Sequence, residues 1–219
     1  MKVIFSLFVF FLSMVDVSAE NAEYWLIQQD FIKMGTRELY ETQKSLQLKK
    51  QSYQVIGVAD LADPEFIFLM PIKKLANLDQ YAPFAKQIDE GLLGSCINFQ
   101  IFSLHQLLQK SSLRPYETFS ADRPYYSYAI YEVEQSAGSA LEEIMIKKSS
   151  SHKKGDRWCF WKSLLAGEYP KYIFCASFAT KEEMKEWSTE DLIDEPGLKN
   201  ILRSKKTGWM KRQKEFCLP

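Results

Sequence analysis

The sequence lacks the residue patterns of the common metalloenzymes and hydrolases. It has two histidines in 219 residues, His105 and His152, and no C-x-x-C pair, so no zinc-binding spacing is present. A nucleophile elbow, a Walker loop and a dinucleotide-binding glycine pattern are also absent. The 28 basic residues balance 28 acidic ones, which argues against a nucleic-acid-binding protein, because such a protein needs a basic surface. The sequence therefore predicts no familiar catalytic site, no metal site and no cofactor.

Long apolar runs are also missing, except at the start of the chain. Residues 3–15 are uncharged and follow Lys2, and residues 17–19 end in small side chains. A basic start, an apolar stretch of about a dozen residues and small residues before the cut are typical of a secretory signal peptide. The stretch is shorter than the roughly 20 residues of a transmembrane helix. We therefore expect cleavage after Ala19, no membrane anchor in the mature protein, and a secreted or periplasmic location.

What the rest of the sequence does contain is an internal repeat. Gly35 and Gly138 are 103 positions apart, and the residues before them match in type at this spacing. The second copy then has three extra residues, after which the match continues at a spacing of 106. A nearly constant spacing over this length is hard to obtain by chance. We predict two copies, one in residues 20–122 and one in residues 123–219, after a signal peptide in residues 1–19.

Both copies predict the same order of secondary-structure elements. Residues 23–32 and 65–72 are rich in aromatic and branched side chains and predict strands. Residues 36–50 carry many charges and one apolar stripe, which predicts a helix. Ser139 to Glu142 and Thr180 to Glu183 have the spacing of capping boxes at helix starts. The other predicted elements are strands at 52–58, 125–134, 157–164 and 171–178, helices at 74–90 and around 98–110, and fourth strands at 113–119 and 213–217.

The order β-α-β-β-α-β is that of the ferredoxin-like unit, whose sheet is covered by helices on one face only. The other face is apolar and must be buried. The sequence thus predicts an α+β fold in which two tandem ferredoxin-like repeats form an intramolecular pseudo-dimeric α/β barrel. This pattern resembles the dimeric α/β barrel superfamily and, within it, NIPSNAP-like tandem proteins. The resemblance implies a cavity between the sheets. Members of this superfamily range from cofactor-free monooxygenases, haem-degrading enzymes and isomerases to non-catalytic binding proteins.

Alternate residues of the strands would line that cavity. The expected lining residues are Trp25, Ile27, Gln29, Phe66 and Phe68 in the first copy and Tyr128, Ile130, Glu132 and Phe174 in the second. The third strand of the first copy could instead present Ile67 and Leu69. These side chains either surround a small apolar ligand or pack on one another and fill the barrel.

The histidines and cysteines leave alternatives open. His105 is expected on a helix, as a boundary residue rather than a haem ligand or a general base. Cys159 and Cys175 fall on neighbouring predicted strands and could form a disulfide, although buried free thiols are the expected state.

A basic segment lies near the end of the chain. Residues 203–214 contain six basic residues, no acidic residue and Trp209. This composition fits weak contact with an anionic surface. The simpler explanation is a solvated helix end.

An aromatic interior without catalytic motifs predicts an exported, non-catalytic protein that binds a small apolar ligand or a partner. The alternative is an oxidoreductase of the dimeric α/β barrel type, either cofactor-independent or haem-linked. Aromatic pockets with one or two polar groups suffice for such chemistry, so missing motifs do not decide between the two.

Overall fold

The computed structural model describes residues 22–51, 53–61, 64–81, 92–151, 155–164, 169–187 and 200–218. The predicted signal peptide and His152 lie outside these residues, so export stays a prediction. Among the described residues, no helix is both long and apolar enough to span a membrane.

The described part of the chain forms eight strands and four α-helices. The strands are β1 (Tyr24–Ile32), β2 (Ile56–Asp60), β3 (Glu65–Ile72), β4 (Ile97–Leu107), β5 (Tyr125–Val133), β6 (Trp158–Ser163), β7 (Lys171–Phe178) and β8 (Leu202–Arg212). The helices are α1 (Arg37–Leu48), α3 (Leu92–Cys96), α4 (Gly138–Ser150) and α5 (Lys181–Glu186). Short 3₁₀ turns lie at Leu75–Tyr81, Gln109–Ser111, Pro115–Glu117 and Lys214–Phe216.

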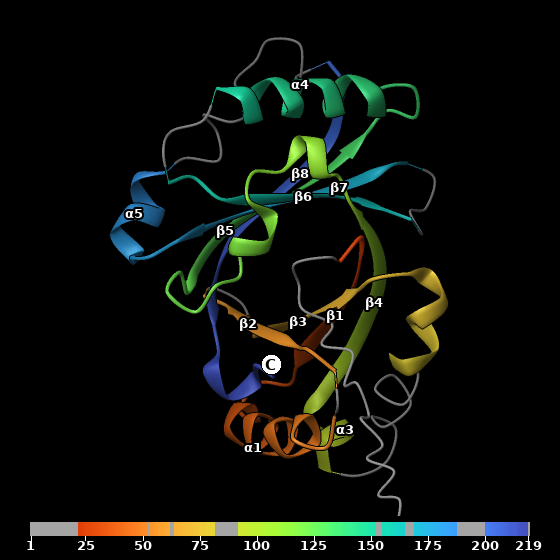
Figure 1. Cartoon of the computed structure of the whole chain (residues 1–219). Coiled ribbons are helices and arrows are strands. Elements are labelled where there is room, and N and C mark those ends of the chain that lie inside the picture. Colours follow the sequence, from red (N-terminus) through yellow and green to blue (C-terminus); the bar gives the residue numbers. More distant parts are fainter. Residues whose placement is uncertain are drawn as a thin grey trace, which may run out of the picture.

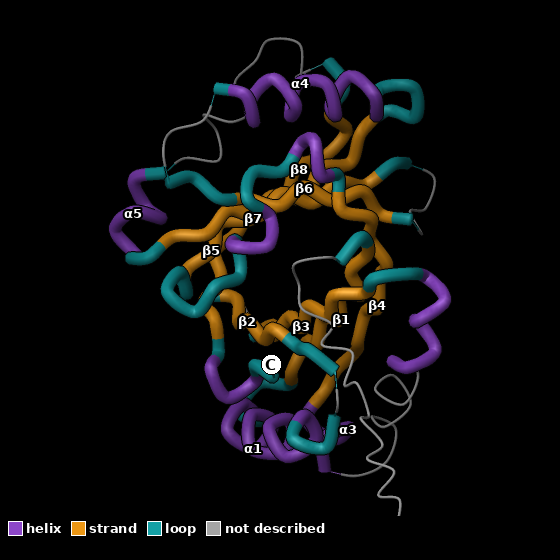
Figure 2. Tube along the Cα trace, viewed as in Figure 1, coloured by secondary structure: helices purple, strands orange, loops and turns teal. Residues whose placement is uncertain are grey.

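The eight strands close into one antiparallel barrel in the order β1-β3-β2-β8-β5-β7-β6-β4. Helices α1 and α3 lie outside one side of the barrel and α4 and α5 outside the other (Figure 1). The strands surround the centre and the helices form the outer layers (Figure 2). Closure removes sheet edges that would otherwise attract other strands.

Two seams join the strand group β4-β1-β3-β2 to the group β8-β5-β7-β6. β2 pairs with β8 at one seam, and β4 pairs with β6 at the other. The segments that follow β4 and β8 then cross to the opposite group, where Leu113 bridges to Trp158 and Leu218 bridges to Val55. A side chain at Gly57 would collide with Phe216, so glycine permits this close crossing. Each group is therefore partly covered by chain that comes from the other.

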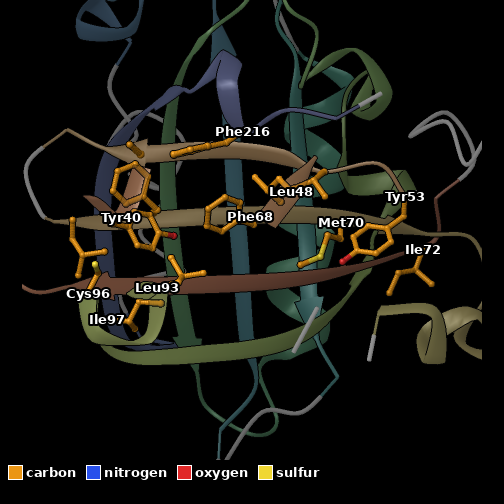
Figure 3. Packing of buried hydrophobic residues seen from close by; sticks show 14 of the residues in the cluster. Tyr40, Leu48, Tyr53, Phe68, Met70, Ile72, Leu93, Cys96, Ile97 and Phe216 are labelled. Atoms are coloured by element: carbon orange, nitrogen blue, oxygen red, sulfur yellow. The ribbon is translucent and has the colours of Figure 1, made fainter. Parts of the chain in front are cut away.

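Alternate side chains of each strand point into the barrel or out toward the helices. The inward side chains form one buried cluster, which includes Trp25 and Trp161. The outward side chains form two further clusters, one beneath α1 and one beneath α4. Figure 3 shows the cluster beneath α1, in which Tyr40 and Phe68 pack around Phe216, with ring centroids 6.5 and 5.8 Å from that of Phe216.

Four predictions near the ends of the copies are wrong. The segment around 98–110, predicted as a helix, is strand β4, and the basic segment is strand β8 rather than a helix end. The predicted fourth strands at 113–119 and 213–217 contain 3₁₀ turns instead. In β4, Ile97, Ile101 and Leu104 also have helical spacing, so the apolar pattern fits both structures. Long pairing with β1 decides in favour of the strand.

The spacing of 103 between the first strands is also wrong, by two residues. The β1–β4 register shifts after Phe31 and the β5–β8 register shifts after Glu132, which are 101 positions apart. Gly35 lies in the turn before α1 with a φ of 79°, whereas Gly138 is the first residue of α4. Because strand side chains alternate with a period of two, this error leaves each residue on its predicted face.

Candidate functional site

The interior of the barrel is largely filled by aromatic side chains. The ring centroids of Trp25 and Phe119 are 5.4 Å apart, and those of Trp25 and Trp161 are 5.8 Å apart. Tyr126 packs against Phe119 from the other strand group, at 5.4 Å. A cavity of about 30 Å³ remains beside them. It has room for a water-sized molecule and lies far below the roughly 300 Å³ of a small-molecule pocket.

Most of the predicted lining residues do face this interior. The cavity is lined by Ile27, Gln29, Ile67, Leu69, Phe119, Tyr128, Ile130, Trp161, Ile173, Cys175 and Met210. The Tyr128 hydroxyl donates a 3.0 Å hydrogen bond to Asp60. Glu132 lies farther along β5, where its carboxylate accepts a bond from Ser204 and pairs with Lys171 at 3.7 Å.

Three predicted lining residues point the other way. Phe66 and Phe68 belong to the cluster beneath α1, and Phe174 belongs to the cluster beneath α4. The inward residues of β3 are Ile67 and Leu69, the other of the two sets that the sequence permits. Both faces of β3 are buried and apolar, so its sequence has no polar alternation that could mark the inner face.

His105 lies on β4 inside the barrel rather than on a helix. It is 3% exposed, and its Nε2 lies 2.8 Å from the Ser103 hydroxyl. Burial lowers the pKa of His105 to about 4, so the ring is neutral at pH 7. A haem group does not fit here, because the histidine is enclosed and the neighbouring cavity measures about 30 Å³. Among the described residues, no group of three His, Cys, Asp or Glu side chains could hold a metal.

Cys159 and Cys175 lie directly opposite each other on β6 and β7. Both face the barrel interior and are free thiols. Burial raises the pKa of each thiol well above its usual value. Neither is therefore a reactive thiolate at neutral pH.

A larger cleft lies outside the barrel, between α5 and the outward face of β6 and β7. Its volume is about 430 Å³, within the range of small-molecule sites. Aromatic walls come from Trp158, Phe178 and Trp187, and Trp187 is held by stacking on Phe174 at 5.7 Å with an interplanar angle of 8°. Trp158 and Phe178 are buried, at 3% and 6% exposure, so Trp187 is the aromatic side chain with substantial exposed surface in the cleft.

Charged side chains surround these aromatic walls. Arg123 donates two hydrogen bonds to the carbonyl of Ser177, of 3.1 and 2.7 Å, which fix its guanidinium at the cleft. Arg157 lies on the same lining and pairs with Glu117 at 3.1 Å. Glu183 accepts a bond from the amide of Ala179 at the start of α5, and Glu186 is exposed on the same helix. The lining carries three carboxylates, on Asp156, Glu183 and Glu186, and two guanidinium groups, so it can hold a planar, polarised aromatic molecule beside a carboxylate.

A cluster of polar side chains is fully enclosed beneath α1. The Lys44 ammonium lies 3.1 Å from the Asp30 carboxylate, and both side chains are 0% exposed. The Tyr40 hydroxyl donates a 2.6 Å bond to the same carboxylate, which also accepts from the amides of Gln28 and Gln100. Burial raises the pKa of Tyr40 and lowers that of Lys44. Because it is enclosed, this cluster is better suited to structure than to catalysis.

Sequence reasoning identified neither the cleft nor the buried cluster. The cleft residues Arg123, Trp158 and Trp187 come from three separate segments, so no local spacing marks them. The buried cluster did have a signal. Lys44 stands midway between Tyr40 and Leu48, which share one stripe of α1, so a charge interrupts an otherwise buried face.

No family model matches the sequence, and no curated protein matches it. Solved structures do match its fold. An anthrone oxidase-like protein has a TM-score of 0.61 at 12% identity, covering 90% of this chain and 93% of that one. A protein named as a monooxygenase from Fusobacterium nucleatum has a TM-score of 0.60 at 9% identity, covering 89% and 94%. A mutant chlorite dismutase from Candidatus Nitrospira defluvii, in complex with cyanide, has a TM-score of 0.57 at 10% identity, covering 89% and 92%.

These neighbours contradict the expectation of a non-catalytic binding protein, because their names are those of oxidoreductases. That expectation rested on missing motifs, and the fold is compatible with chemistry that needs none. At these identities the likeness concerns the fold alone. The chain has the eight-stranded α+β fold of the dimeric α/β barrel proteins to which its structural neighbours belong.

Proposed function

We propose that this protein is an oxidoreductase that oxidises a small aromatic compound with O₂ and without a bound redox cofactor. The observation that carries the proposal is the outer cleft, where about 430 Å³ is lined by the partly exposed Trp187 and by Arg123 and Arg157. The barrel interior offers about 30 Å³ and cannot take such a substrate. The oxidoreductase names of the structural neighbours support the class of reaction.

The chemistry requires a substrate that can itself reduce O₂ once it has lost a proton. An anthrone-like methylene is one example, and the name of one neighbour contains this compound. A base removes a proton from the methylene, and the resulting carbanion adds O₂ to give a hydroperoxide. Loss of water then leaves a carbonyl group. One oxygen atom of O₂ becomes the carbonyl oxygen and the other leaves as water, so no outside reductant is needed.

The cleft residues take three roles in this proposal. Trp187, which is partly exposed, stacks on the substrate and orients it. Arg123 and Arg157 stabilise the negative charge that develops on the substrate oxygen, as fixed donors do in other enzymes. Glu186 accepts the proton, because Glu183 is already bonded at the start of α5.

The test measures O₂ uptake with anthrone as the substrate and follows the carbonyl product by absorbance. We expect Glu186→Gln to lower kcat at least about 100-fold, the usual contribution of a positioned base. Arg157→Gln should lower kcat/KM by about 100-fold, the usual contribution of one charge-stabilising donor. The matched controls are Glu38→Gln and Arg37→Gln on α1, which lie outside the cleft lining and should leave the rate unchanged.

Two results would overturn the proposal. The first is O₂ uptake that does not change in either cleft variant. The second is a haem or flavin absorption band that co-purifies with the activity, which would favour the cofactor-linked alternative.

We further propose that the two strand groups arose by tandem duplication, with 20–122 and 123–219 as ferredoxin-like repeats related to NIPSNAP-like proteins. In support, β3 with β7 and β4 with β8 have equal lengths, and both register shifts occur at corresponding residues. We also propose export through a signal peptide in residues 1–19. Mass spectrometry of the protein from its native host tests export, because cleavage leaves Glu20 as the first residue.

A further inference from the structure

The outward face of β8 carries a basic strip that the proposed reaction does not use. Its members alternate along the strand and so share one face: Arg203, Lys205, Trp209 and Lys211. At roughly 3.4 Å per residue these positions extend about 27 Å. Lys205 and Lys211 are both exposed, and β8 itself contains no acidic residue.

An apolar pair lies in the middle of the basic strip. Leu61 donates its amide to the carbonyl of Trp209 at 3.0 Å across the β2–β8 seam. Trp209 is 47% exposed and Leu61 is 43% exposed. Both point outward, because Met210 and Asp60, the pair before them in register, face the barrel. A large aromatic ring and a leucine are thus presented to the exterior between two lysines.

The remaining charges of this region are partly compensated. Arg203 pairs with Glu134 at 3.1 Å and lies over the ring of Tyr169 at 3.8 Å. Lys211 lines a surface depression together with the carboxylates of Asp122 and Glu215 and with the basic groups of Arg212 and Lys214. Lys205 and Lys211 are thus the exposed lysines of this face, one on either side of Trp209.

We propose that this strip binds the anionic surface of a lipid bilayer. Lysines attract anionic headgroups, and tryptophan and leucine insert at the boundary between headgroups and acyl chains. A flat strand face suits a planar surface. An acidic protein would use the lysines equally well but would not need an exposed Trp209 and Leu61 beside them.

The experiment measures co-sedimentation of the full chain with two kinds of vesicle, phosphatidylcholine alone and phosphatidylcholine mixed with phosphatidylglycerol. We expect preferential binding to the anionic vesicles and loss of that preference at 1 M salt, where the Debye length is about 3 Å. Lys205→Glu with Lys211→Glu should weaken anionic binding at least about 25-fold, at about fivefold per lysine. Residues 1–19 are common to all variants, so a difference between variants reports on the strip.

The matched control is Lys49→Glu with Lys50→Glu, which makes the same charge change at exposed positions after α1. The control should retain binding, and thermal unfolding should show both variants folded. Trp209→Ser should weaken anionic binding at unchanged charge. Equal loss in the strip and control variants would overturn the proposal, as would equal binding to both vesicles. Binding to poly-glutamate but not to vesicles would replace the bilayer with an acidic protein.

Discussion

Beneath α1 the barrel buries a lysine, an aspartate and a tyrosine, whereas the equivalent layer beneath α4 buries a methionine, a tyrosine and a leucine. The helices begin at Arg37 and Gly138, so equal steps along them reach corresponding positions. Asp30, Tyr40 and Lys44 of the first layer correspond in this way to Tyr131, Leu141 and Met145 of the second.

The second layer shows that the fold does not require buried charge. Removing two charges from water costs several kcal/mol per ion, and their attraction repays that cost only with good geometry and further hydrogen bonds. Asp30 meets this condition, since Lys44, Tyr40 and two amide side chains all contact its carboxylate. At these three positions the first layer is held by hydrogen bonds and an ion pair around Asp30, and the second by apolar packing.

Removing one member of the buried polar cluster beneath α1 should have the largest effect on stability. Lys44→Met leaves the Asp30 carboxylate buried without its cation, and we expect a loss of about 3–5 kcal/mol in the free energy of unfolding. Replacing Asp30, Tyr40 and Lys44 together by the residues of the second layer should cost far less, because no charge remains buried. Chemical denaturation of both variants measures the difference. A triple variant as unstable as the single one would show that the layers are not equivalent.

The two seams offer a similar comparison. His105 on β4 corresponds to Met210 on β8, and both face the barrel. Burial lowers the pKa of His105 from 6.5 to about 4, so the unfolded chain binds a proton in this range and the folded chain does not. This contribution to stability is complete above pH 6.5 and is lost as the pH falls toward 4, by about 3 kcal/mol.

Replacing His105 with methionine, the residue at the corresponding position of the other seam, isolates this contribution. His105→Met should flatten the fall in unfolding free energy between pH 7 and pH 4 relative to the native chain. Denaturant titrations at several pH values measure it, and carboxylates that titrate in the same range affect both proteins alike. An unchanged pH dependence would contradict the assignment to His105.

The strands that sequence reasoning predicted well are those with dense apolar composition. β3 and its counterpart β7 have the strongest runs, and the predicted bounds of 65–72 match β3 in full. The faces of β1 and β5 were also predictable, because an alignment error of two residues preserves alternation. The strand β4 was not predictable, because the spacing of its apolar residues fits a helix as well as a strand. Only its pairing with β1 shows that it is a strand.

The candidate site was less predictable than the fold for a related reason. Trp25 and Ile27 were correctly placed inside the barrel, but the sequence could not say that Phe119, which follows β4, would enter and fill it. The cleft depends on where α5 stops and on which face of β7 it leaves uncovered. Both are properties of packing between distant segments.

Helix starts provide the smallest contrast. The Thr180 hydroxyl accepts from the Glu183 amide at 3.1 Å, which is one half of the predicted capping box; the Glu183 carboxylate accepts from the Ala179 amide at 3.0 Å, one residue before the cap. The box predicted at Ser139 is wrong, because α4 begins at Gly138 with Ala137 at the cap position, and Glu142 instead accepts a 2.8 Å bond from the Tyr172 hydroxyl.

Thr180→Ala should therefore cost about 1 kcal/mol, the usual value of a threonine cap. Thr180→Ser keeps the oxygen and should cost less. Thr36, at the start of α1, makes no side-chain cap and donates instead to the Lys33 carbonyl at 2.8 Å, so its loss should not fray the helix in the same way. Hydrogen exchange separates the cases, because only Thr180→Ala should speed exchange of the first amides of α5. Faster exchange at the start of α1 in Thr36→Ala, to the same degree, would mean that local capping does not distinguish the two helices.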